Sequence, residues 1–400
     1  MEYKTYKLGT CFSLIENGAI IKQRKEAKGF PITRIETLSH GKFNRDKLGH
    51  ADIFDTTPYK RYFLEDKDLI MSHINSRAFL GRTVLYRKKG NEQIIHGMNV
   101  LRIKTNEQFL DPVFASYLFK TSHFKKAIDS IRKDAINQSS INIFDICNIQ
   151  ISLPSITEQR KISHALQLID KKIETNHLIN DNLEAMAKQL YDYWFVQFDF
   201  PNEEGKPYKS SGGAMVWNDK LKREIPKEWM ASNYTDLFTI GNGQTMPQNE
   251  GLVPAYGGNG IVKMVEISNY PACIIIGRVG ANCGSIHYSK VPCWVSDNAI
   301  SICSKNDDWQ PFLFYSLKLY NLSKNKGGSS QPLITHEALK HLYFPMSEKH
   351  INQFCHIVNE LQDLIYSNQQ EILKLTKQRD ELLPLLMNGQ AMVNSDLSDD

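Results

Sequence analysis

A seven-residue repeat constrains this chain more than any other feature of its sequence. Between residues 162 and 194, apolar and asparagine side chains recur every seven residues in two interleaved rows. These rows are Ile162, Ile169, Asn176, Leu183 and Leu190, and Leu166, Ile173, Asn180, Ala187 and Trp194. Two such rows are typical of the seam through which long helices pair. The spacing therefore predicts a long helix that packs against a partner helix.

Both rows occur a second time, about 192 residues further along the chain. The second pair of rows is Phe354, Leu361, Asn368, Leu375 and Leu382, and Val358, Ile365, Ile372, Arg379 and Leu386. Helical periodicity would give two unrelated helices the same period, but it does not explain an asparagine at the third position of both first rows. We therefore interpret the chain as an internal duplication.

The two predicted helices, Thr157–Trp194 and Lys349–Leu386, are each about 57 Å long at 1.5 Å per residue. An antiparallel pair fits them best, because it places the two domains at opposite ends with pseudo-twofold symmetry. It also leaves Asn176 and Asn368 near the middle, where buried amides fix the register of a coiled coil at a cost in stability.

Short motifs outside the helices repeat as well. The motifs that precede each helix are Gln138-Ser139-Ser140 with Leu153-Pro154 in the first half, and Ser329-Ser330-Gln331 with Phe344-Pro345 in the second. Each proline is expected to stop a strand just before its helix. A looser match pairs Gly81-Arg82 with Gly277-Arg278, and Gly97-Met98-Asn99 with Asp297-Asn298.

Between these features the chain reads as short β-branched and aromatic runs with interspersed helical patterns, such as Pro112–Ser130. We predict an α/β (α+β) fold with two mixed α/β domains separated by two long helices that form an antiparallel coiled coil. The predicted parts are a first domain at 1–154, a long helix at 155–198, a linker at 199–224, a second domain at 225–345, a second long helix at 346–390 and an acidic tail at 391–400.

The charge is distributed unevenly. Residues 1–150 contain about 25 lysines and arginines against 16 aspartates and glutamates, a net charge near +9, whereas the remaining 250 residues carry about −5. Nucleic acid is a common reason for such asymmetry, although a basic soluble surface gives the same count. Apolar runs such as Leu382–Met387 are far too short to span a bilayer, and the start of the chain lacks a secretory signal. We predict a cytoplasmic protein without a membrane partner.

Motifs for catalysis are missing. Asp111-Pro112-Val113-Phe114 lacks the second proline of a DNA methyltransferase tetrapeptide, and Pro112 is better explained as the first residue of a helix. There is no phosphate-binding glycine loop and no cluster of metal ligands. Cys273, Cys283, Cys293 and Cys303 recur every ten residues, a spacing that favours positions on strands over a zinc site. We predict no catalytic, cofactor or metal site.

Two loops of the second domain are candidates for DNA contact. In Gly277–Ser285 the glycines permit close backbone approach and Arg278 supplies a forked donor for a phosphate or a guanine edge; a tight β-turn is the alternative. In Tyr256–Gly260, Tyr256 is placed to stack and Asn259 to read adenine, unless this is a plain surface loop.

In the first domain, basic residues gather around one hairpin-like region, as solvated strand edges also do. The members of this basic group are Arg77, Arg82, Arg87, Lys88 and Lys89. The complete set of candidate DNA-binding residues is Arg77, Arg82, Lys88, Lys89, Asn99, Tyr256, Asn259, Arg278, Asn282, Ser329 and Ser330.

The segment Leu153–Asp199, which begins LPSITEQRK, resembles the central conserved region of type I restriction–modification specificity subunits. Glu381–Gln390 resembles the terminal conserved region of that family, Ile225–Trp229 the opening of a second target-recognition domain, and Tyr6–Gly9 a domain start. The second repeat departs from the family pattern, since PMSEKHINQF replaces the Pro-Glu-Gln-Ile run of the first repeat. The start of the second helix is therefore less well defined by the sequence.

The resemblance implies a non-catalytic DNA-reading subunit. Its two target-recognition domains would each bind half of a split, asymmetric site in double-stranded DNA, and the helices would set the gap. It further implies assembly with two methyltransferase subunits, which bring S-adenosylmethionine, and two restriction subunits, which use ATP and Mg²⁺. The chain itself is expected to bind no cofactor.

Two other classes of protein remain as alternatives. A self-sufficient DNA methyltransferase would bind its methyl donor. A coiled-coil scaffold without DNA binding would show no salt-dependent retention on duplex DNA.

Overall fold

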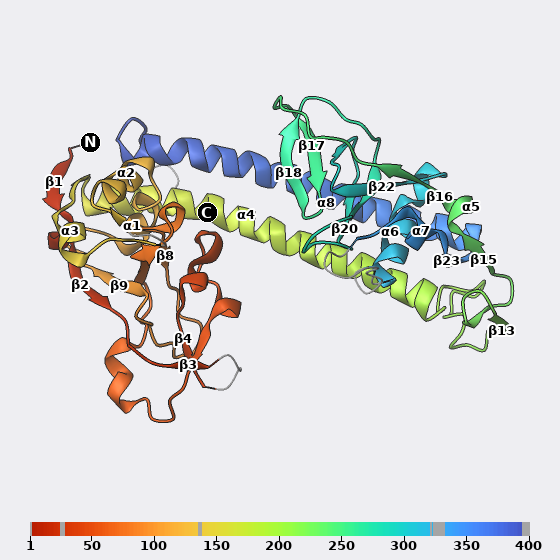
Figure 1. The fold of residues 1–400 in the computed structure, drawn as a ribbon, viewed down its shortest axis with the longest axis horizontal. Coiled ribbons are helices and arrows are strands. Elements are labelled where there is room, and N and C mark those ends of the chain that lie inside the picture. The colour runs from red at the N-terminus through yellow and green to blue at the C-terminus, as the bar shows by residue number, and fades with distance from the viewer. Residues whose placement is uncertain (1, 25–28, 135–137, 321, 323–332, 394–400) are drawn as a thin grey trace. The chain divides into compact units, whose positions relative to one another are not determined.

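The computed structural model describes residues 2–24, 29–134, 138–320, 322 and 333–393. The chain divides into two compact units: unit 1 comprises residues 1–173 and 373–400, and unit 2 comprises residues 174–372 (Figure 1). Each unit thus contains one globular domain together with part of each long helix. None of the helices in the described ranges is long and apolar enough to cross a membrane.

The main sheet of unit 1 is antiparallel and has the strand order β2-β9-β6-β8. Its strands are β2 (Phe12–Asn17), β9 (Val100–Thr105), β6 (Leu69–Ser72) and β8 (Thr83–Leu85). Leu69 and Met71 of β6 belong to the core cluster that includes helix residues, whereas Ile70 belongs to a second cluster. Successive side chains of a strand alternate between faces, so the unbroken apolar run of β6 reflects a sheet that is covered on both sides.

Shorter elements complete unit 1. The small sheets are β3 (Gln23–Arg24), β5 (Gly49–Ala51) and β4 (Phe30–Ile32), and β10 (Lys133–Asp134), β11 (Ser139–Ser140) and β7 (Ile74–Asn75). The short helices are α1 (Pro112–Leu118), α2 (Ser122–Ser130) and α3 (Ile143–Asn148), with 3-10 turns η1 (Leu8–Cys11), η2 (Ile35–Gly41), η3 (Arg45–Lys47), η4 (Thr57–Tyr62) and η5 (Arg77–Phe79). Residues 112–130 thus form two helices rather than one. The second is capped by Thr121, whose hydroxyl accepts the Phe124 N–H.

The domain of unit 1 begins and ends on neighbouring strands. Strand β1 (Lys4–Lys7) pairs antiparallel with β12 (Gln150–Leu153), and β12 is followed directly by the first long helix. The Tyr3 hydroxyl donates a hydrogen bond to the Leu386 carbonyl at 3.5 Å, close to the end of the second long helix. A residue near the start of the described chain and one near the end of the second long helix are therefore in contact within unit 1.

Unit 2 repeats this topology. Its main sheet has the order β16-β22-β19-β20, with the strands β16 (Phe238–Asn242), β22 (Ala299–Ser304), β19 (Cys273–Gly277) and β20 (Ile286–Ser289). Its outer strand pair is β15 (Met230–Asn233) with β23 (Tyr343–Met346). In each unit the first, last, second and third main strands in chain order lie side by side, which supports the predicted duplication.

The remaining elements of unit 2 are short. They are the sheet β18 (Gly260–Val265), β17 (Val253–Gly257) and β21 (Trp294–Val295), the hairpin β13 (Met215–Asn218) and β14 (Arg223–Pro226), the helices α5 (Tyr234–Leu237), α6 (Gln310–Leu319) and α7 (His336–Lys340), and the 3-10 turn η7 (Asp307–Trp309). The hairpin begins in the expected linker, and its second strand extends two residues beyond it. Phe200, also in that linker, stacks on Tyr208 and on Trp229, so this segment is ordered by aromatic packing.

The long helices match the heptad prediction closely. Helix α4 spans Ile156–Tyr191 and continues through a π turn at Asp192–Val196, and α8 spans Glu348–Met387. Every residue of the four predicted rows is buried or half-buried, including Ile169, Leu183, Leu190, Leu361, Leu375 and Leu382. Leu178 and Leu364, which lie outside the rows, are more than half exposed.

Contacts inside each unit show that the helices run antiparallel. In unit 2 the Asn176 amide donates to Glu371 at 2.7 Å, and the Asn368 amide donates to Asn180 at 2.9 Å. Asn176 and Asn368 therefore do not hydrogen-bond to each other. Each bonds instead to a residue that lies about one helical turn from the other asparagine. In unit 1 the guanidinium of Arg379 donates to Asp170 at 2.9 Å, and Asp170 also accepts the Tyr117 hydroxyl at 2.6 Å.

The difference between the two helix starts has a structural reason. Gln159 is completely buried and bridges three backbone groups: its amide donates to the carbonyls of Phe109 and Pro154, and its oxygen accepts the Asp111 N–H. In the second repeat the 192-residue offset brings Ile351 to this position, where it is equally buried in the core. The hydrogen bonds of Gln159 in the first repeat are thus replaced by apolar packing of Ile351 in the second.

The four regularly spaced cysteines do not share one environment. Cys273 and Cys293 lie with their sulfur atoms 3.5 Å apart in one core cluster of unit 2, and Cys283 belongs to another cluster. Across the described residues, no group of three or more His, Cys, Asp or Glu side chains has an arrangement that could hold a metal ion.

The amide pair in the helix seam makes a testable prediction. Asn368→Leu removes the donor to the buried Asn180 oxygen, and we expect it to lower the free energy of unfolding by about 1–3 kcal/mol. The double variant Asn180→Leu/Asn368→Leu should recover most of this loss, because no buried polar group is left unpaired. Urea unfolding of the four proteins in this cycle measures the coupling, and additive losses would contradict the prediction.

Candidate nucleic-acid interface

In both units the segment after the first main strand crosses the segment before the last main strand, at one end of the main sheet. We name this backbone contact the crossing. In unit 1 the Ala19 N–H donates to the His96 carbonyl at 2.8 Å, and the Met98 N–H donates to the Ala19 carbonyl at 3.2 Å. In unit 2 the Gln244 N–H donates to the Val295 carbonyl at 2.9 Å. The Asp297 N–H donates back to the Gln244 carbonyl at 3.1 Å, which completes the equivalent crossing.

Glycine is required where the strands cross. A Cβ on Gly18 would lie 2.3 Å from the carbonyl carbon and oxygen of Gly97, and a Cβ on Gly243 would lie 1.7 Å from the Ser296 carbonyl oxygen. Both glycines follow an asparagine at the end of the first main strand. The Asn-Gly pairs at 17–18 and 242–243 are therefore a signal in the sequence from which the crossing could have been predicted.

A return loop emerges at the same end of each sheet. In unit 1 the Ser72 N–H donates to the Arg82 carbonyl and the Gly81 N–H donates to the Ser72 carbonyl, at 2.9 and 2.8 Å. In unit 2 Gly277 makes the same two bonds with Ser285 and Gly284, again at 2.9 and 2.8 Å. We name residues 73–80 and 278–283 the return loops of units 1 and 2.

These bonds correct the alignment of the repeat. Gly81 is equivalent to Gly284, not to Gly277, and both Gly81 and Gly284 have positive φ, 72° and 90°. Glycine adopts this left-handed conformation without the steric cost that other residues incur. The sequence match between Gly81-Arg82 and Gly277-Arg278 was therefore wrong in register, although the two loops do correspond.

The candidate residues of unit 1 do not form one group. Arg77 lies in the return loop, is exposed and forms a 3.7 Å ion pair with Asp129. Arg82 stacks on Phe79 and is half-buried, which suits a structural role for its guanidinium. Lys88 and Lys89 are exposed but follow β8, at the opposite end of that strand from Arg82. β6 and β8 do pair antiparallel, as a hairpin-like region requires, but its basic side chains do not gather in one place because β8 separates them.

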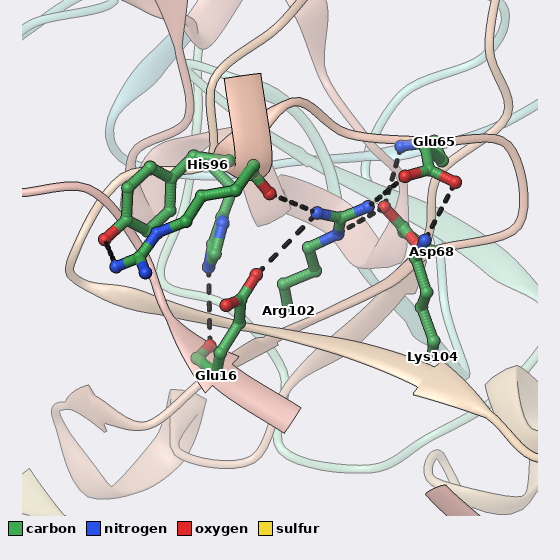
Figure 2. A network of polar contacts seen from close by, with 8 residues as sticks. Glu16, Glu65, Asp68, His96, Arg102 and Lys104 are labelled. Carbon is green, nitrogen blue, oxygen red and sulfur yellow. Dashed lines mark hydrogen bonds and ion pairs between the residues drawn. The ribbon is translucent and has the colours of Figure 1, made fainter. Parts of the chain in front are cut away.

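A network of ion pairs surrounds the buried guanidinium of Arg102 in unit 1 (Figure 2). Arg102 of β9 is 2% exposed and contacts Asp68 at 2.7 Å, Glu65 at 3.1 Å and Glu16 at 3.7 Å. Lys104 reaches Glu65 at 2.8 Å, and this hydrogen bond lowers the pKa of Glu65. Burial raises the pKa of Asp68, and the hydrogen bond from the Glu65 N–H and the guanidinium of Arg102 partly offset this. This network joins two basic side chains to three acidic ones, so it takes nothing from the basic excess of the domain.

Two uncharged histidines lie close to the crossing and the return loop of unit 1. Burial lowers the pKa of His73 to about 4 and that of His96 to about 3. His96 precedes the crossing, and its Nε2 lies 3.4 Å from the Glu16 carbonyl oxygen. Neither Nδ1 atom has a hydrogen-bond partner among the described residues. Both imidazoles are therefore neutral at pH 7, so the base of this loop carries no histidine charge.

In unit 2 the loops line an open cavity of about 450 Å³. Its lining is formed by the β17–β18 turn, the return loop and the residues after the crossing: Met246, Gly257, Gly258, Asn259, Val262, Val279, Gly280, Ala281, Asn282, Ser296, Asp297 and Asn298. The structure thus brings the predicted residues Asn259 and Asn282 together, and both are exposed. Asn298 was absent from the predicted set.

The other candidates of unit 2 differ in position. Tyr256 is only 8% exposed and lies in a core cluster, and burial raises the pKa of its hydroxyl to about 12. The prediction that Tyr256 stacks on a base is therefore wrong. Arg278 opens the return loop and is half-buried, and its side chain makes no hydrogen bond or ion pair within the described parts of the chain. Ser329 and Ser330 lie outside the described residues.

Comparisons with known proteins identify relatives of this chain. A family model described as the type I restriction modification DNA specificity domain matches residues 1–185 and 226–382. The putative type I restriction enzyme MjaX specificity subunit of Methanocaldococcus jannaschii is 27% identical over 415 residues, which cover 98% of this chain and 95% of that protein. The MjaIX specificity subunit of the same organism is 27% identical over 69% of this chain and 68% of its own length.

A solved structure has the same fold. The S subunit of a type I restriction–modification system from M. genitalium matches with a TM-score of 0.60 at 18% identity, over 96% of each chain.

The crossing makes a prediction with a matched control. Gly243→Ala should lower the free energy of unfolding by about 2–3 kcal/mol, because its methyl group overlaps the Ser296 backbone. Gly258→Ala should change it by less than about 1 kcal/mol, since the nearest atom to the added Cβ is 3.5 Å away. Urea unfolding compares the two variants. Equal stability would show that the crossing does not need glycine.

Proposed function

This chain belongs to the family of type I restriction–modification DNA specificity subunits, and we propose that each of its units reads one half of a bipartite, asymmetric DNA site. Recognition of DNA sequence for a type I system is the function of the family. The observation that supports two readers is the repeat of sheet order, glycine crossing and return loop in the two units. Side chains on loops held by a rigid sheet are well suited to contact base edges.

We propose that the helices set the distance between the half-sites. Helices α4 and α8 each contribute residues to both units, and each unit has its own antiparallel contacts between them. A helix of fixed rise transmits length, because each added residue extends it by about 1.5 Å. The unread spacer in the DNA would follow from that length.

We further propose which activities belong to partners. A type I specificity subunit works together with other restriction–modification subunits. For this chain we propose two methyltransferase subunits that carry S-adenosylmethionine and two restriction subunits that use ATP and Mg²⁺. The chain itself would direct these subunits to a sequence in double-stranded DNA and catalyse neither methyl transfer nor cleavage.

Exchange of recognition segments tests the two-reader proposal. Residues 8–149 lie between the paired strands β1 and β12, and residues 234–342 lie between β15 and β23. Replacing either segment with its counterpart from a relative keeps the strand pair next to the helices. Each exchange should change one half of the methylated motif and leave the other half intact. Methylation sequencing of a host that carries the complete system checks this, and a change in both halves would contradict it.

A paired insertion tests the role of the helices. Adding four residues after Ile173 in α4 and four after Ile372 in α8 preserves the Asp170–Arg379 and Asn176–Glu371 contacts. The helices lengthen by about 6 Å, so the unread spacer should grow by one or two base pairs at about 3.4 Å each. The half-site sequences should stay unchanged. Methylation mapping measures the spacer, and an unchanged spacer in an active complex would refute the proposal.

A further inference from the structure

We infer that Asn99 in unit 1 and Asn298 in unit 2 each read an adenine in their own half-site. This inference rests on the proposed function and extends it to single side chains. Asn298 is a new candidate. Asn99, which the sequence already suggested, occupies the equivalent position in unit 1.

The backbone makes the two asparagines equivalent. The Val100 N–H donates to the Gly97 carbonyl at 3.2 Å, and the Ala299 N–H donates to the Ser296 carbonyl at 2.9 Å. These bonds close two four-residue turns, 97–100 and 296–299, with asparagine third in each. Each turn lies between the crossing and a central strand of the main sheet, β9 or β22. The two side chains are therefore presented from the same place in the fold.

The fold does not account for asparagine at these positions. Asparagine is favoured in turns when it adopts positive φ or hydrogen-bonds to the nearby backbone. Neither Asn99 nor Asn298 is among the residues with positive φ. Both are exposed, and neither amide side chain hydrogen-bonds to any described residue. Their neighbours differ, Met98 against Asp297, so the shared asparagine points to a shared ligand contact.

The cavity beside Asn298 has a polar lining, and the described residues that form it include no basic side chain. The Arg278 N–H donates to the Asn298 carbonyl at 2.9 Å and holds the turn against the return loop. Gly258 lies between the loops: its Cβ position is 3.7 Å from the Asn298 carbonyl oxygen and 3.9 Å from the Asn282 Cβ. Three amides, those of Asn259, Asn282 and Asn298, thus line one cavity.

Two further groups of this cavity indicate a base edge as the ligand. No lysine or arginine occurs among the described residues that line it, and the exposed carboxylate of Asp297 would repel a phosphate. The Ser296 hydroxyl is buried without a hydrogen-bond partner among those residues, so this cavity has unused hydrogen-bonding capacity. In the major groove, adenine offers an N6 donor beside an N7 acceptor, which a carboxamide matches with two hydrogen bonds.

The test is a selection from a pool of random duplexes, with the full chain in complex with its partner subunits. The unmodified protein should enrich a bipartite sequence. Asn298→Ala should lose the preference for adenine at one position of one half by about 5- to 150-fold, and Asn99→Ala should do the same in the other half. Asn298→Asp should shift that position toward cytosine, whose N4 amino group donates to a carboxylate. Asn182→Ala, at an exposed position of α4, is the matched control and should change no position.

The outcomes separate this inference from the function on which it rests. If the unmodified complex enriches no bipartite sequence, the proposed function fails. If that complex enriches one but Asn298→Ala gives the same profile, or weakens binding equally at all positions, only the assignment of Asn298 fails. Thermal unfolding of each variant is measured alongside, and an unchanged midpoint with a change at one base position supports the inference.

Discussion

The antiparallel pairing of α4 and α8 is the constraint on which the rest of the structure depends. Each unit uses part of both helices as one wall of its core: Ile162 and Leu386 in unit 1, Ala187 and Phe354 in unit 2. Neither domain could bury its apolar face if the helices were separated, because the same side chains serve the seam and the core. The polar contacts at Asn176 and Asn180 make this pairing specific in register, since a shifted helix would leave buried amides unpaired.

Outside the helices, each unit combines a backbone crossing that both units share with a return loop that differs between them. The glycine crossing brings two backbone segments into close contact, and the two units share the two hydrogen bonds that form it. The return loops differ in length, with eight residues at 73–80 and six at 278–283, and they differ in sequence. A repeated frame that carries dissimilar loops is what an asymmetric site requires, because the two halves then differ in sequence while the same fold presents both readers.

The sequence predicted the helices almost to the residue because a heptad row is a local pattern in which every position reports burial. It could not align the domains, since their equivalence is carried by backbone hydrogen bonds such as those of Gly81 and Gly284 while the side chains diverge. Tyr256 was misplaced for a related reason: polarity and a flanking glycine turn suggested exposure, but its strand faces the core. Asn298 was left out of the predicted set because Gly97-Met98-Asn99 and Asp297-Asn298 match only loosely, and the crossing shows that this match is in register.

The contact between Tyr3 and the Leu386 carbonyl closes the chain on itself. The first strand of unit 1 therefore lies beside the end of the last helix in the same unit. The order of the segments along the gene is then one of several that would build the same molecule. Circularly permuted forms, with the ends joined and a new opening in an exposed connection, are compatible with this fold. A gene for such a protein could exchange or reorder its modules by recombination without a new architecture.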